Sequence, residues 1–118
     1  MKIPDSVRIA GVEYSVSYVP NLRHENQLAY GQIDFDNSEI RLSSTDGVEH
    51  QRRCITLLHE ILHGVVHANG MEVDSEEEIV SMFAKGLYQV LQDNGERLFD
   101  IAKKGNKNDK QRKAEQET

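Results

Sequence analysis

The stretch His59-Glu60-Ile61-Leu62-His63 decides how the rest of this 118-residue chain is interpreted. It places two imidazoles four residues apart, with a carboxylate between them, inside an apolar segment with helical periodicity. Side chains four residues apart lie on one face of an α-helix, about 6 Å apart along its axis, so both rings can reach one metal ion. The carboxylate beside the first histidine can lean over that ion and take a proton from water. The pattern therefore predicts a metal centre, and zinc is the metal that suits it.

Length and composition predict one small globular domain over residues 1–104. A single core can stabilise a chain of this size, and its 37% apolar and 29% charged residues are typical of globular proteins. No long uncharged apolar run is present, and the N-terminus lacks the apolar region of a secretory signal, so we expect no membrane role and no export. The one cysteine, Cys54, cannot form an internal disulfide and is expected to be a buried free thiol. These features favour a cytoplasmic protein.

The charge of the chain is unevenly distributed. The net charge is -6, but residues 103–118 hold six basic and three acidic residues, so the remainder carries about -9. An acidic body repels a phosphate backbone, and nucleic acid is therefore not an expected partner. Residues 105–118 have almost no apolar side chains to bury and are predicted to form a charged, disordered tail.

Two β-hairpins are predicted in the first half of the chain. Apolar and aromatic residues alternate with polar ones over Val7–Val19, with Ala10-Gly11 at the turn. The next segment, Pro20–Gln27, is polar and is expected to be irregular. Leu28–Phe35 and Glu39–Ser43 then form the second hairpin, and the three residues between them supply turn chemistry. The hairpins predict a small antiparallel or mixed sheet.

A long helix carrying the two histidines follows. Thr45, Asp46 or Gly47 could begin it, and Asn69-Gly70 ends it as a left-handed C-cap pair. Because the helix is apolar on most sides, we expect it to be buried. The fold class is therefore α+β, with the hairpins packed on this helix and on a second one.

The second helix begins after Asp74 or Ser75 and runs to about Asn94-Gly95. Three glutamates occupy its first turn, where negative charge suits the helix dipole. A short third helix over residues 96–104 is possible. The apolar residues of the second helix that repeat at helical spacing, and that we expect to pack on the first helix, are Val80, Phe83, Ala84, Leu87 and Leu91.

The metal centre needs a third protein ligand, because catalytic zinc sites normally have three. Glu76, Glu77 and Glu78 lie just across the Asn69-Gly70 turn, and one of them can face back towards the histidines if the two helices pack as a pair. Spacing alone leaves the choice among the three open.

His67 continues the histidine row but is not expected to be a ligand. It lies about 12 Å along the helix axis from His59, too far for all three rings to meet one ion. Capping of the helix C-terminus or a supporting contact to the site suits it better. The metzincin pattern is also excluded, because Val66 and Asn69 stand where that pattern needs glycine and histidine.

Over residues 28–92 the chain resembles the HExxH zinc metallopeptidases, and more narrowly the small ImmA/IrrE-like metallopeptidases of phages and mobile elements. The second helix is similar to the family pattern Glu-x-x-Ala-Asn/Asp-x-Phe-Ala, which would end at Phe83-Ala84. This alignment implies a gluzincin-like ligand set in which Glu77 is the third ligand. Ser81 then replaces the Asn or Asp that supports the site in the family, and Val80 replaces an Ala.

The resemblance implies a zincin-like fold and zinc-dependent hydrolysis of peptide bonds. The substrate would be a protein or peptide in the cytoplasm, which is the host cytoplasm if the chain is phage-encoded. Such a substrate would pair with an exposed sheet edge, here the Leu28–Ser43 hairpin. Glu60 would take the proton of the attacking water. By residue type alone, the candidates for stabilising the oxyanion are Tyr30, His50 and Tyr88.

Two other functions fit the same residues. The first is a zinc-binding regulatory or interaction protein of the same fold without catalytic turnover. The second is a metal-free binding module in which the histidines simply pack.

Overall fold

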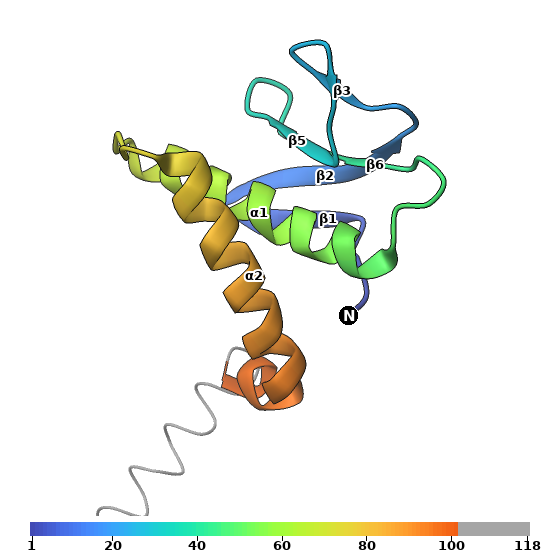
Figure 1. Ribbon diagram of the computed structural model, residues 1–118. Helices are drawn as coiled ribbons and strands as arrows, with labels where there is room; N and C mark the ends of the chain where they lie inside the picture. Colours follow the sequence, from blue (N-terminus) through green and yellow to red (C-terminus); the bar gives the residue numbers. More distant parts are fainter. Residues whose placement is uncertain (102–118) are drawn as a thin grey trace, which may run out of the picture. The chain divides into compact units, whose positions relative to one another are not determined.

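The computed structural model of the chain describes residues 1–101 and has the expected α+β class, with a four-stranded mixed sheet and two main helices (Figure 1). In chain order the elements are β1 (Ser6–Ile9), β2 (Val12–Val19), β3 (Arg23–His24), β4 (Gln27–Leu28), β5 (Gly31–Asp34), β6 (Glu39–Ser43), α1 (His50–Asn69) and α2 (Glu76–Asn94). In the part of the chain that the structure describes, no helix combines the length and apolarity needed to cross a bilayer.

The first predicted hairpin is confirmed. β1 and β2 pair antiparallel, and Ala10 and Gly11 join them with φ angles of 49° and 83°. Positive φ at both central residues is the requirement of a type I′ turn, whose twist matches that of the strands it joins. β2 then pairs with β6 in parallel, which makes the sheet mixed with the strand order β1-β2-β6-β5.

The second hairpin also forms, but its first strand is shorter than predicted. β5 begins at Gly31, not at Leu28, and pairs antiparallel with β6 so that Ile33 faces Ile40. The turn is held by the Asp34 carboxylate, which accepts hydrogen bonds of 3.1 Å from the backbone N–H groups of Asp36 and Asn37. This is an Asx-type turn, in which a side chain replaces a backbone acceptor.

The expectation that the segment Pro20–Gln27 is irregular is wrong. It contains a small two-stranded ribbon of β3 and β4, with Leu28 opposite Arg23. Glu25 and Asn26 form its turn with φ angles of 52° and 66°. Glutamate seldom adopts positive φ, so the sequence gives little sign of this two-residue hairpin loop.

α1 ends as predicted, at a left-handed Gly70 with a φ of 63°. It begins at His50, so none of Thr45, Asp46 or Gly47 is its first residue. Residues 46 and 47 instead form a turn before the helix. The Arg53 guanidinium donates to the carbonyls of Ser43 (2.9 Å) and Thr45 and ties the first turn of the helix to the end of β6.

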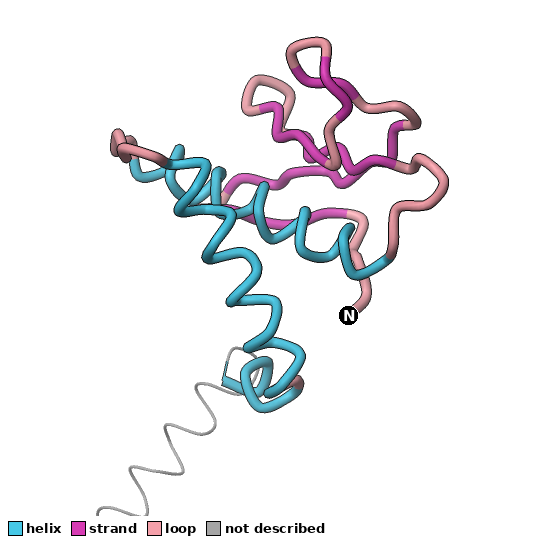
Figure 2. The backbone as a smooth tube through the Cα atoms, in the orientation of Figure 1, coloured by secondary structure: helices cyan, strands magenta, loops and turns pink. Residues whose placement is uncertain are grey.

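One face of α1 packs on one face of the sheet (Figure 2). The central buried cluster joins side chains from the strands and the helix: Ile9, Tyr14, Ile40, Leu42 and Leu57. Cys54 is buried as predicted. The expectation that α1 is buried on most sides is wrong, because a single sheet covers only one side of a helix and Val65 remains 42% exposed.

α2 begins after Ser75 with Glu76, Glu77 and Glu78 in its first turn, as predicted. Its buried residues are Val80, Ala84 and Tyr88, one helical turn apart. Phe83 and Leu87 belong to the neighbouring column and are exposed, at 57% and 37%, so their predicted packing on α1 is wrong.

Residues 1–88 form one compact unit, and a second begins at Gln89. Residues 96–101 are helical, in the region of the possible third helix. Residues 102–104 and the predicted tail at 105–118 lie outside the described residues, so the single domain over 1–104 and the disordered tail stay predictions.

Candidate metal centre

His59 and His63 lie one turn apart on α1, as the spacing predicts, and both are largely buried, with 19% and 15% of their side chains exposed. Their Nε2 atoms are 3.1 Å apart. The rings meet edge to face, with centroids 4.8 Å apart and an interplanar angle of 66°. The helix thus aims the same nitrogen of both rings at one point.

The carboxylate of Glu77 lies at that same point. Its Oε1 is 2.9 Å from Nε2 of His59, and its Oε2 is 2.8 Å from Nε2 of His63. Ligand atoms that each sit about 2.0–2.1 Å from a tetrahedral zinc ion are about 3.3 Å from one another. The two imidazoles and the carboxylate therefore have nearly the separation that a shared ion requires, and their donor chemistry fits zinc.

Glu60 lies in the buried part of the same cluster and is only 6% exposed. In the described residues, His59, Glu60 and His63 form a group that could hold a metal ion, with ligand atoms within 4.8 Å of one another. Two carboxylates are thus candidates for the third position. We favour Glu77, because its oxygens contact both Nε2 atoms directly, whereas Glu60 satisfies only the looser spacing.

The environment of Glu60 disfavours the charged form of its side chain. Burial raises its pKa to about 7, and the negative charge of Glu77 adds to this, while His63 acts in the opposite direction. Desolvation is the dominant cause, since a buried carboxylate loses the water that stabilises its charge.

Glu76, one residue before Glu77, holds the other side of the His63 ring. Its Oε2 is 2.6 Å from Nδ1 of His63. A carboxylate that accepts the Nδ1 proton fixes the ring orientation and leaves Nε2 free to bind a metal. Sequence reasoning considered Glu76 only as an alternative ligand and missed this supporting contact.

The two histidines are held differently. Burial lowers the pKa of His59, although Glu77 opposes the effect. Burial also acts to lower the pKa of His63, but the hydrogen bonds with Glu76 and Glu77 together outweigh it, and the pKa is raised. The supporting contact of His59 is weaker, because its Nδ1 is 3.5 Å from the hydroxyl of Ser81.

The cluster opens into a cleft of about 600 Å³ that lies between α1, the start of α2 and the β5 side of the sheet. β5 is an edge strand of the sheet, and it approaches α1 most closely at Gly31. A Cβ atom at Gly31 would lie 2.4 Å from Cγ2 of Thr56 and 3.5 Å from Cγ of Glu60. A glycine is therefore needed for the edge strand to pass this close to Glu60.

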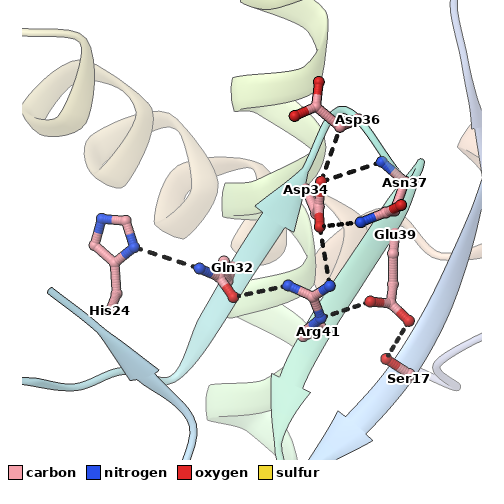
Figure 3. Close-up of polar contacts among 8 residues, drawn as sticks. All are labelled: Ser17, His24, Gln32, Asp34, Asp36, Asn37, Glu39 and Arg41. Carbon is pink, nitrogen blue, oxygen red and sulfur yellow. Dashed lines mark hydrogen bonds and ion pairs between the residues drawn. The ribbon is translucent and has the colours of Figure 1, made fainter. Parts of the chain in front are cut away.

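A polar network secures β5 and β6 next to the cleft (Figure 3). Arg41 forms ion pairs with Asp34 at 3.0 Å and Glu39 at 2.5 Å, and donates to Gln32 at 3.1 Å. Hydrogen bonds from Asn37, and then Arg41, hold the pKa of Asp34 below its usual value. The network continues through Gln32 to His24 of β3, and both of these residues line the cleft.

Of the three candidates for oxyanion stabilisation, only Tyr30 lines the cleft, and the Arg52 guanidinium lies 5.0 Å from its ring centroid. His50 is at the other end of α1, where its Nε2 is 2.5 Å from the carbonyl of Met1. Tyr88 is buried on α2 outside the cleft lining. His67 stacks on Phe35 with ring centroids 3.8 Å apart, so its side chain supports the hairpin end and not the histidine pair.

The chain matches no protein-family model, no curated protein and no solved structure.

Proposed function

We propose that this chain is a zinc-dependent metallopeptidase of the gluzincin type, in which His59, His63 and Glu77 hold the ion and Glu60 is the catalytic base. The observation that supports it most strongly is the position of the Glu77 carboxylate, 2.9 and 2.8 Å from the Nε2 atoms of the two histidines. Three donors meet at one point in the lining of a cleft, with a second acidic side chain, that of Glu60, buried beside them.

The donor set favours zinc over harder cations. Two imidazole nitrogens and one carboxylate are typical zinc ligands, whereas calcium and magnesium prefer oxygen alone. When bound, zinc supplies a Lewis acid and lowers the pKa of a coordinated water to about 7.

The side chains around the ion divide the remaining work. Glu60 accepts a proton from the attacking water and returns it to the amine that leaves when the peptide bond breaks. Glu76 keeps the His63 ring in the orientation that presents Nε2. Tyr30 is the candidate oxyanion donor that faces the cleft.

β5 supports a peptide as the substrate. As the last strand of its sheet, it has one edge that is not paired within that sheet, and residues 29–33 line the cleft beside Glu60. An extended peptide can add to such an edge through backbone hydrogen bonds. In this proposal the substrate is an intracellular protein or peptide, the protein acts in the cytoplasm, and the relationship is to the ImmA/IrrE-like enzymes of phages and mobile elements.

Glu60→Gln tests the assignment, and Glu78→Gln is the matched control. Glu78 is exposed on the same turn as Glu76 and Glu77 but does not line the cleft, and its substitution makes the same change from carboxyl to amide. We expect Glu60→Gln to keep bound zinc and to lose at least about 100-fold in peptide cleavage, which is the usual contribution of a positioned base. Glu78→Gln should retain both properties.

The measurements are zinc content by elemental analysis and cleavage of a proteome-derived peptide mixture followed by mass spectrometry. Unchanged cleavage by Glu60→Gln would show that Glu60 is not the base. A wild-type chain that binds zinc but cleaves no peptide would instead support the regulatory or interaction function.

A further inference from the structure

The cleft carries two basic side chains besides the residues of the histidine cluster. Arg52 lies seven residues before His59, on the same face of α1 and about 10 Å away along the axis. Lys85 lies one turn beyond Ser81, whose hydroxyl is 3.5 Å from His59. Both Arg52 and Lys85 line the cleft.

No acidic residue in the described part of the chain pairs with either cation. Within residues 1–101, no ion pair involves Arg52 or Lys85. The carboxylates that line the cleft, Glu60, Glu76 and Glu77, belong to the histidine cluster. The cleft of this acidic chain, whose net charge is -6, therefore has carboxylates at the histidine cluster and two cations beyond it.

The Arg52 guanidinium is held in a way that leaves its donors available. It lies over the Tyr30 ring, 5.0 Å from the centroid. A cation–π contact occupies no N–H group of the guanidinium, and within residues 1–101 none of these N–H groups forms a hydrogen bond or an ion pair. Those groups can therefore bind a planar carboxylate through two parallel hydrogen bonds.

β5 and α1 run past each other in the same direction, which relates Arg52 to the rest of the site. Tyr30 contacts Arg52, Gly31 approaches Thr56 and Glu60, and further along Phe35 stacks on His67. A peptide beside the β5 edge would thus pass the histidine cluster and Arg52 in turn. An extended chain advances about 3.3 Å per residue, so the rise of about 10 Å along α1 between the backbone positions of Arg52 and His59 corresponds to three peptide residues.

We propose that Arg52 and Lys85 form a carboxylate-binding subsite, which selects peptides with an aspartate or glutamate side chain about three residues from the bond to be cleaved. This inference rests on the proposed peptidase function for the meaning of that distance. The binding of an acidic side chain at Arg52 can nevertheless be measured without catalysis.

The test measures binding to the metal-free full-length chain in EDTA, so that no acidic probe can bind to zinc. The probes are fluorescent decapeptide pools with amidated C-termini, randomised over uncharged residues except for a central Glu in one pool and a central Gln in the other. Fluorescence anisotropy should show about tenfold tighter binding of the Glu pool, and the preference should weaken at high salt.

Arg52→Gln should remove the preference, whereas Arg8→Gln should leave it unchanged. Arg8 is an exposed arginine on β1 outside the cleft, so the control loses the same charge. Lys85→Gln, on the other helix, should reduce the preference independently, which keeps the test valid if Arg52→Gln folds poorly. Tyr30→Phe should keep the preference, because the ring under Arg52 remains.

A wild-type chain that binds the two pools equally would overturn the proposal, as would a preference that Arg52→Gln and Arg8→Gln leave equally intact. A third pool has a central Gln and free C-termini. If it bound as tightly as the Glu pool, and Arg52→Gln removed this binding, the proposal would also be overturned, because Arg52 would then bind the C-terminal carboxylate of a peptide and not an acidic side chain.

The zinc-loaded wild-type chain separates this inference from the proposed function. Cleavage without any preference for acidic residues would leave the peptidase function standing and remove the subsite. If the chain cleaved no peptide but bound the Glu pool in an Arg52-dependent way, the carboxylate-binding subsite would stand and the peptidase function would be wrong.

Discussion

Glu76 and Glu77 are neighbours in the sequence, but their carboxylates contact different nitrogens of the same imidazole. Glu77 is 2.8 Å from Nε2 of His63, and Glu76 is 2.6 Å from its Nδ1. Consecutive residues of a helix point about 100° apart. Both carboxylates reach the His63 ring because this ring, which comes from α1, contacts the first turn of α2. In the proposed metal centre, Glu77 would bind the ion and Glu76 would orient the His63 ring.

This division predicts different effects of substitution at the two positions. Glu76→Gln keeps a hydrogen-bond acceptor at Nδ1 but removes the negative charge, and we expect zinc affinity to fall about 10–100-fold. Competition with a chromophoric chelator measures this affinity, with Glu78→Gln as the charge-matched control. If Glu76→Gln bound zinc as tightly as the control, the supporting role would be wrong.

β5 passes close to α1, and this approach restricts which residue can occupy position 31. A Cβ at Gly31 would lie 2.4 Å from Cγ2 of Thr56, whereas one at Gly86 on α2 would meet nothing within 4 Å. The first glycine is required by packing, and the second is an exposed helix position where alanine is the better helix former.

Gly31→Ala should therefore destabilise the protein by about 1–3 kcal/mol, the usual cost of overpacking. Gly86→Ala should stabilise it by about 0.5–1 kcal/mol. Adding Thr56→Ser to Gly31→Ala removes the obstructing methyl group but keeps the hydroxyl that donates to the Arg52 carbonyl at 2.7 Å. Urea unfolding measures all three, and the interpretation fails if the double variant is no more stable than Gly31→Ala.

At the scale of the whole molecule, local signals predicted the elements and long-range pairing decided their arrangement. The turn at Ala10-Gly11 and the cap at Gly70 need positive φ, and the glycines at positions 11 and 70 mark both in the sequence. The parallel pairing of β2 with β6 joins residues more than twenty positions apart, and no local periodicity encodes it. The exposure of Phe83 likewise depends on which column of α2 faces inward, which its apolar pattern leaves undecided.

The candidate site shows the same division. The four-residue spacing of His59 and His63 was sufficient to predict that they share a face, because a helix fixes that geometry by itself. The contact of Glu76 with Nδ1 depends on how α2 approaches α1, and the cleft position of Arg52 depends on β5. Neither follows from spacing within one element.

Elemental analysis of the purified chain decides whether His59, His63 and Glu77 hold a zinc ion, with Glu77→Ala and Glu78→Ala measured beside the wild type. The wild type and Glu78→Ala should each hold about one zinc ion per chain, and Glu77→Ala should hold much less, because it loses one of three protein ligands. A wild-type chain without metal, or a loss of zinc in Glu78→Ala but not in Glu77→Ala, would contradict the account.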